Sequence, residues 1–321
     1  MSTKGLFYQN VIAVIWDFDQ TLSPHYMQRP LFEAYGVDED AFWREVNALP
    51  GYYARAGITV QRDTCYLGHL LSYVEHGRFP DLSNARLREL GGEIAFFPGV
   101  PEVFGRLRAI VQEGEFRYAD LRVEHYVVST GLAEMIRGSR IADQLDGVWA
   151  SEFIEEPAEP GEDLAGTPRA GRIRQIAGFL DNTSKTRAIF EINKGVNVER
   201  SVTVNSAIPE EERRVPMRNM IYVADGPSDV PSFSVVRKHG GLAYAVYPPD
   251  DEERFRQAVA LLDSDRVDAY GEADYTDTSP TYRWLALKIR DMAKRAVAER
   301  KQTLQNRVAR EPSHAPAEDR G

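Results

Sequence analysis

Residues 11–24 read VIAVIWDFDQTLSP, and this stretch decides the expected fold. Six apolar residues, 11–16, end abruptly in the acidic, turn-like segment DFDQTLSP. This pattern is typical of a parallel strand that is buried on both faces and whose carboxyl end opens into a loop. Open α/β sheets bind their ligands at such strand ends. The segment therefore predicts both a central strand and a candidate site.

Short apolar runs recur along the chain, with helix patterns between them. The runs are 125–128 (HYVV), 148–150 (VWA), 221–224 (IYVA) and 244–247 (YAVY). The clearest helix patterns cover residues 100–112 and 185–193. Strands that alternate with helices predict an α/β fold with a Rossmann-like, doubly wound parallel sheet.

Residues 23–96 differ, because they carry several helix signals and no strand pattern. Gly36 would end a first helix, Asp38 would cap a second, a third would follow Thr59, and Ser83 would cap a fourth. We therefore expect an inserted all-helical cap domain over residues 23–96, with the α/β core formed by residues 1–22 and 97–277.

Near the end of the chain, the spacing of apolar residues predicts one long helix over 278–310, and the polar sequence EPSHAPAEDRG predicts a disordered tail over 311–321. Basic side chains surround the apolar stripe of this helix. They are expected to form a solvated face, with contact to an anionic membrane or a partner as the less favoured alternative. The polar stretches 155–171 and 205–219 are expected to be surface excursions.

Composition limits the classes of partner. The 321 residues include 49 Asp and Glu against 39 Lys and Arg, for a formal net charge of -10, which argues against nucleic acid as the principal partner. A single cysteine, Cys65, excludes an internal disulfide and a cysteine-rich zinc site. The first apolar run is too short for a transmembrane segment and lacks a cleavage site, so we expect a cytoplasmic protein. No pattern predicts an oligomeric state.

Two acidic clusters follow two of the predicted strands. Asp17 and Asp19 follow the first strand, and Asp225 and Asp229 lie in ADGPSD after the run IYVA. If both strands are central and parallel, up to four carboxylates converge in one crevice, where they would demand a cation. Mg²⁺ meets that demand, because it prefers oxygen ligands and retains waters for a substrate phosphate. The alternative, that each cluster only caps a helix, is less favoured because two strand ends carry one.

These residues resemble the motifs of the haloacid dehalogenase-like (HAD) phosphatases, and within them the phosphoserine phosphatase-like branch. The first motif, D-x-D-x-T, is matched by IWDFDQTL, and the second, a strand ending in Ser or Thr, by YVVSTG at Ser129. The third, a lysine that opens a helix, is matched by Lys185, and the fourth by ADGPSD. Lys194 is the weaker alternative for the lysine, because it would lie at the far end of the helix.

The resemblance implies a role for each matched residue. Asp17 would be the nucleophile that becomes an aspartyl phosphate, and Asp19 the general acid and base. Mg²⁺ would be held by Asp17, the main-chain carbonyl of Asp19 and Asp225, while Asp229 would orient metal waters or bind directly. The substrate phosphoryl group would contact Ser129, Lys185 and backbone groups around Phe18, Thr130 and Gly131.

The expected function is Mg²⁺-dependent hydrolysis of a small organic phosphomonoester. The presence of Asp19 favours a phosphatase over a dehalogenase, which needs no proton donor. Two alternatives stay open: a catalytically weak phosphate-binding or regulatory protein, and a phosphotransferase that uses the same site. Side chains near the expected pocket mouth are His25, Tyr26 and Arg29, with Arg55 and Arg62 as cap cations; a surface or packing role is favoured for each.

Overall fold

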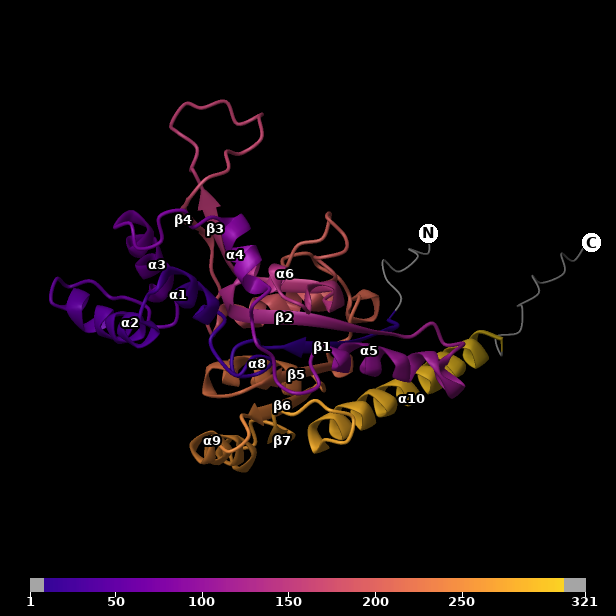
Figure 1. Ribbon diagram of the computed structural model, residues 1–321. Helices are drawn as coiled ribbons and strands as arrows, with labels where there is room; N and C mark the ends of the chain where they lie inside the picture. The colour runs from indigo at the N-terminus through magenta and orange to yellow at the C-terminus, as the bar shows by residue number, and fades with distance from the viewer. Residues whose placement is uncertain (1–8, 309–321) are drawn as a thin grey trace, which may run out of the picture.

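The structure is a computed structural model that describes residues 9–308. Within these residues, seven strands form one sheet in the order β4-β3-β2-β1-β5-β6-β7. All neighbours are parallel except β3 and β4. The predicted α/β fold with a mainly parallel sheet is therefore confirmed (Figure 1). The strands are β1 Val11–Trp16, β2 Arg122–Leu132, β3 Gly147–Glu155, β4 Ile173–Gly178, β5 Met220–Ala224, β6 Leu242–Tyr247 and β7 Ala269–Glu272.

Strand β1 lies in the middle of the sheet, between β2 and β5. All six of its residues are buried. Successive side chains of a strand point to opposite faces, so Ile12, Val14 and Trp16 enter one core, whereas Val11, Ala13 and Ile15 enter the other. Burial on both faces explains why this strand has a continuous apolar sequence with no polar alternation.

Helices cover both faces of the sheet. Residues of α5 (Glu102–Ala109), α6 (Ala133–Gly138) and α10 (Pro280–Val308) belong to the core that contains Trp16. Residues of α7 (Ser184–Lys194), α8 (Val230–Lys238) and α9 (Glu252–Asp263) belong to the opposite core. This double covering matches the predicted doubly wound arrangement. Within the described residues, no helix is both long and apolar enough to cross a membrane.

The segment after β1 is helical, as expected. It contains α1 (Arg29–Tyr35), α2 (Glu39–Ala54), α3 (Cys65–Glu75) and α4 (Asn84–Gly91). Gly36 ends α1 with a positive φ of 63°, and the side chains of Asp38 and Ser83 accept backbone N–H groups at the starts of α2 and α4. Helices α1 to α3 project beyond the end of the sheet (Figure 1). The chain leaves and returns side by side, because the Phe97 N–H donates to the Leu22 carbonyl over 2.9 Å.

Helix α4 packs closely against α6 of the core. A Cβ atom at Gly91 would lie 2.1 Å from the carbonyl oxygen of Met135, and one at Gly138 would lie 1.7 Å from that of Arg88. Only glycine therefore permits this approach of the two backbones. The division of the chain into a core and a separate cap domain stays a prediction. Helix α4, which falls within the predicted cap, packs directly on the core.

Several elements differ from the expectations. Strands β4 and β7 were not predicted; β4 follows the exposed loop that projects from β3 at the top of Figure 1.

The polar stretch 205–219 is only partly a surface excursion, because Val215 and Met217 are buried. The C-terminal helix is confirmed, with Leu285, Ile289 and Met292 buried. The tail predicted to be disordered, 311–321, lies outside the described residues.

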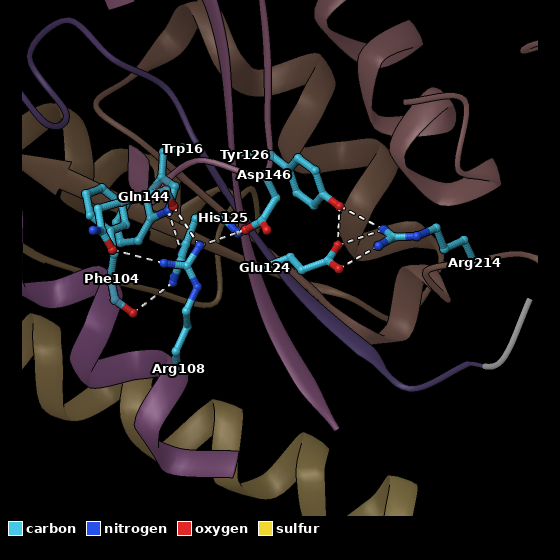
Figure 2. A network of polar contacts seen from close by, with 9 residues as sticks. All are labelled: Trp16, Phe104, Arg108, Glu124, His125, Tyr126, Gln144, Asp146 and Arg214. Atoms are coloured by element: carbon cyan, nitrogen blue, oxygen red, sulfur yellow. Dashed lines mark hydrogen bonds and ion pairs between the residues drawn. The ribbon is translucent and has the colours of Figure 1, made fainter. Parts of the chain in front are cut away.

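A buried polar network fastens the first half of β2 to its neighbours (Figure 2). Glu124 forms an ion pair with Arg214, which also donates to the Tyr126 hydroxyl over 2.8 Å. His125 accepts from the Trp16 indole through Nδ1, which leaves Nε2–H to donate to the Phe104 carbonyl. Burial, with Arg108 nearby, lowers the pKa of His125 to about 3, so the ring is neutral and structural.

Candidate active site

Three strand ends meet where the sequence places its motifs. Asp17 follows β1, Ser129 lies in the last third of β2, and Asp225 follows β5. Because β1 pairs in parallel with both β2 and β5, these residues share one edge of the sheet. The Asp17 N–H donates to the Val223 carbonyl over 2.9 Å, which extends the pairing to the first catalytic candidate. The geometry thus follows directly from strand order.

Lys185 joins the two acidic clusters. It lies in the first turn of α7, and its Nζ is 2.8 Å from Oδ1 of Asp17 and 2.8 Å from Oδ1 of Asp229. The lysine is 1% exposed. Burial acts to lower the pKa of Lys185, but Asp17 and Asp229 outweigh burial and raise it well above its usual value. Lys194, the alternative, instead donates to the carbonyls of Val204 and Ser206.

Three carboxylates could hold a divalent metal ion. Oxygens of Asp17, Asp225 and Asp229 all lie within 4.8 Å of one another. Burial raises the pKa of Asp17 to about 6 against the opposing effect of Lys185, and burial with the nearby Asp17 and Asp229 charges raises that of Asp225 to about 7. Burial is the larger cause of both shifts, and repulsion between the carboxylates adds to it, so a bound cation would favour the ionised forms.

The charge of the site also fits Mg²⁺. Asp17, Asp225 and Asp229 carry three negative charges when ionised, whereas Lys185 and Arg254 supply two positive ones. The three carboxylates thus leave an excess of negative charge that favours a cation, and hard oxygen ligands are those that Mg²⁺ prefers. The Asp19 side chain is outside the carboxylate trio, in keeping with its expected contribution through the main chain.

Asp19 is held apart from these ligands. Its Oδ1 accepts the Met27 N–H over 2.8 Å, from the segment that leads into α1. Burial, and next the charge of Asp17, raises the pKa of Asp19 well above its usual value. A raised pKa favours the protonated form of the carboxyl group, which is the form that can donate a proton.

A local irregularity of β2 shapes the second motif. The register with β3 shifts between Val128 and Leu132, which frees the backbone around Ser129 from regular pairing. Ser129 Oγ accepts the Gly131 N–H over 3.0 Å, and the Thr130 carbonyl accepts from the Tyr66 hydroxyl. A Cβ at Gly131 would lie 2.2 Å from Cε of Met27, so a larger residue at this turn would require the flexible end of the Met27 side chain to shift. The Phe18 side chain is fully buried, which leaves only its backbone for a ligand.

A cavity of about 680 Å³ lies over these groups, between the core and helices α2 and α3. Asp17, Asp19, Ser129, Thr130, Gly131, Lys185 and Asp225 line its core side. His25, Tyr26, Arg29 and Arg62 line it too, so the structure brings these four to the pocket. Arg55 is not among its lining residues and lies over the Tyr52 ring, 5.3 Å from its centre. Surface packing is therefore the role that fits Arg55.

Sequence reasoning missed several residues of this site. Arg254, in the first turn of α9, donates from Nη1 to Oδ2 of Asp225 over 3.0 Å. Tyr222 donates from its hydroxyl to Asp229 over 2.7 Å, and Ser228 donates to the other oxygen of the same carboxylate. The signal for Arg254 was the helix start after the YAVY run, capped by Asp251. Tyr222 carried no separate signal, because it lies inside an apolar strand.

Comparisons with known proteins add the following. No family model matches the chain. An uncharacterized protein of Borreliella burgdorferi is 37% identical over 287 residues, which are 88% of this chain and 97% of that protein. Among solved structures, a HAD family hydrolase of Salmonella enterica serovar Typhi is 13% identical with a TM-score of 0.47, over 82% of this chain and 67% of that one.

A second solved structure, a phospho-aspartyl intermediate analogue of phosphoserine phosphatase, is 16% identical with a TM-score of 0.45 over 81% of this chain and 93% of that one. At such values neither structural similarity establishes an activity for this chain. The 37% identity spans nearly the whole of both sequences. The chain therefore belongs to the same protein family as the Borreliella burgdorferi protein.

Proposed function

We propose that the protein is a Mg²⁺-dependent phosphatase of the HAD type that hydrolyses a small phosphomonoester through an aspartyl phosphate on Asp17. One observation supports this function above all. A single buried lysine contacts Asp17 and Asp229 at 2.8 Å each, and a third carboxylate, Asp225, lies within reach of the same ion. Phosphoryl transfer needs chiefly such positioned charge.

In the first step, a carboxylate oxygen of Asp17 attacks phosphorus, and the bond from phosphorus to the ester oxygen breaks. Asp19 gives its proton to the departing alcohol oxygen, for which its raised pKa and its fixed position on the Met27 N–H are suited. In the second step, Asp19 takes a proton from water, and the resulting hydroxide attacks phosphorus. Inorganic phosphate leaves, and Asp17 regains its carboxylate.

The remaining residues hold the phosphoryl group. Lys185 neutralises charge on Asp17 and on the phosphoryl oxygens, and Ser129 donates its hydroxyl hydrogen to one of them. Backbone N–H groups near Phe18 and Gly131 would complete the cradle; Gly131 lines the cavity, and its N–H donates to the Ser129 hydroxyl that would contact the phosphoryl group. Asp17, Asp225 and Asp229, with the Asp19 carbonyl, would hold Mg²⁺, which would supply electrostatic stabilisation of the phosphoryl charge.

The test is release of phosphate from p-nitrophenyl phosphate with Mg²⁺ and with EDTA. We expect activity only with the metal, and loss of at least about a thousandfold in Asp17→Asn. Asp263→Asn, at an exposed position at the end of α9, is the matched control and should keep full activity. Metal-independent activity, or activity retained in Asp17→Asn, would refute the proposal.

Product analysis separates hydrolysis from the other functions that this site permits. A phosphatase gives free phosphate in an amount equal to the alcohol. A phosphotransferase would instead give a new phosphoester when an acceptor alcohol is added, and a phosphate-binding protein would give neither. In Asp19→Asn we expect a slowly hydrolysed phosphoryl adduct, visible by intact-protein mass spectrometry and absent from the double variant that also carries Asp17→Asn.

A further inference from the structure

The cap side of the cavity has a chemical character of its own. Three aromatic rings line it, with ring centres 5.0 Å apart for Tyr26 and Trp43 and 5.8 Å apart for Trp43 and Tyr66. Tyr66 also donates its hydroxyl to the Thr130 carbonyl over 2.7 Å, which ties this wall to the phosphoryl end. Aromatic faces of this kind attract a desolvated cation.

An unpartnered acceptor lies on the same wall. Gln28 is 2% exposed and lines the cavity, yet its Oε1 has no hydrogen-bond partner among residues 9–308. It directly follows Met27, whose N–H fixes Asp19. Gln28 and Asp19 both line the cavity, so the acceptor belongs to the pocket in which the alcohol of a substrate would leave. A buried amide oxygen without a partner costs free energy, which a ligand N–H would recover.

Charge at this end favours a cation. The carboxylates of Glu39, Asp40 and Asp63 line the cavity against the guanidinium groups of Arg29 and Arg62. Arg29 is already engaged, because its Nε lies 3.1 Å from Oε2 of Glu39. Removing this pair leaves the carboxylates of Asp40 and Asp63 against the guanidinium group of Arg62, an excess of one negative charge on the cap side. The indole N–H of Trp43 is an unpartnered donor on this wall, and the oxygens of a phosphomonoester are acceptors that it suits.

Building on the proposed phosphatase activity, we infer that the substrate is the phosphomonoester of a small amino alcohol. Its protonated primary amine would lie against the aromatic wall and donate to Gln28 Oε1. A primary ammonium group has three N–H donors, so it can donate both to Gln28 Oε1 and to the carboxylates. A quaternary ammonium group has no N–H donor. An amino acid phosphate would add a carboxylate, and on the cap side of the cavity only the guanidinium groups of Arg29 and Arg62 could pair with it. Gln28 is accordingly a specificity-determining residue.

The experiment compares four esters with the Mg²⁺-loaded full chain: ethanolamine phosphate, ethyl phosphate, choline phosphate and serine phosphate. Ethyl phosphate matches ethanolamine phosphate but lacks the amine. We expect kcat/KM for ethanolamine phosphate to exceed that for each of the others by about tenfold or more. Equal values for ethanolamine and ethyl phosphate, or a preference for choline or serine phosphate, overturn the inference.

Variants of Gln28 distinguish recognition from packing. In Gln28→Leu the preference for ethanolamine over ethyl phosphate should fall to within about threefold, while kcat/KM for ethyl phosphate stays near the wild-type value. Gln28→Glu, which retains an acceptor, should keep the preference. A uniform loss on both esters in Gln28→Leu would mean a structural role and would overturn the assignment.

Two further outcomes keep this inference separate from the proposed function. Hydrolysis of all four esters without discrimination leaves the phosphatase activity standing and removes the amine site. No hydrolysis of these esters or of p-nitrophenyl phosphate refutes both. Arg55→Gln, outside the cavity, should leave ethanolamine phosphate hydrolysis unchanged. If serine phosphate is the main substrate and Arg62→Gln selectively lowers its hydrolysis, the site recognises a carboxylate and the inference is overturned.

Discussion

The guanidinium group of Arg254 donates a hydrogen bond across 3.0 Å to Oδ2 of Asp225. This contact joins the first turn of α9 to the loop after β5, and both residues line the cavity. It holds the Asp225 carboxylate in one orientation and leaves its other oxygen for a metal ion. It also adds a positive charge to a site that contains four carboxylates.

Arg254→Gln should therefore weaken substrate binding more than turnover. A dianionic ester would meet about one unit less positive charge, and we expect KM to rise roughly fivefold to tenfold with a smaller change in kcat. Steady-state kinetics at saturating Mg²⁺ measures the two constants. Arg256→Gln is the matched control, because Arg256 is exposed on the same helix and pairs with Glu252. A similar KM change in both variants would contradict the assignment.

Lys185→Met should destabilise the metal-free protein strongly. The substitution removes the only ammonium group shown to contact Asp17 and Asp229 among the described residues, and it leaves two buried carboxylates unpaired. Breaking a buried ion pair in this way costs about 3–5 kcal/mol in the free energy of unfolding. Urea unfolding in EDTA measures this loss, and added Mg²⁺ should recover part of it. Lys194→Met, which removes hydrogen bonds to two carbonyls, should cost less.

Stability of the metal-free protein should fall as pH rises from about 4 to about 7. The pKa is raised to about 6 for Asp17 and about 7 for Asp225, so over this range the folded state binds more protons than the unfolded state. Unfolding free energy then decreases with pH, by an amount on the order of a few kcal/mol. Urea midpoints at several pH values test this.

Two controls belong to that pH series. Saturating Mg²⁺ should flatten the decline, because it stabilises the ionised carboxylates of the folded state. Asp225→Asn should reduce the slope in EDTA. A metal-free protein whose stability increases between pH 5 and pH 7 would show that the two raised pKa values are wrong in sign.

Gly138→Ala should be severely destabilising, by about 2–4 kcal/mol, because its new Cβ would overlap the Arg88 carbonyl oxygen of α4. Gly105→Ala, inside α5 with open space around its Cβ, should be neutral or stabilising by up to about 1 kcal/mol. Thermal and urea unfolding of the two variants give the comparison. Equal effects would mean that α4 and α6 separate readily.

Local sequence signals were enough to predict most of what positions the site. The apolar run of β1 stops at Asp17 because the strand is buried on both faces, whereas Asp17, beyond its end, lines the cavity. Asp38 and Ser83 cap helices because their short side chains can accept backbone N–H groups. These features depend on residues within a few positions of one another, so a local sequence pattern is enough to predict them.

Long-range contacts could not be predicted in the same way. Arg254 reaches Asp225 only because β6 lies beside β5, and nothing in its own segment distinguishes it from neighbouring surface arginines. Val215 follows a charged stretch, yet it packs in the core formed with α7. Strand β4 was not predicted because its sequence, IRQIAG, is short and has only one buried residue, Ile173, and it lies at the sheet edge, where one row of its backbone groups needs no partner strand.

The close packing of α4 on α6 at Gly91 and Gly138 limits how the cavity can open. Because α4 is fixed to the core, the helical segment after β1 cannot move as one rigid lid. Helix α3, which carries Tyr66, also contacts strand β4, so widening of the mouth falls to α1 and α2, and α2 carries Trp43. Part of the proposed alcohol-binding wall therefore lies on the helices that would move, so tighter binding of the alcohol would be accompanied by slower exchange of ligand with solvent.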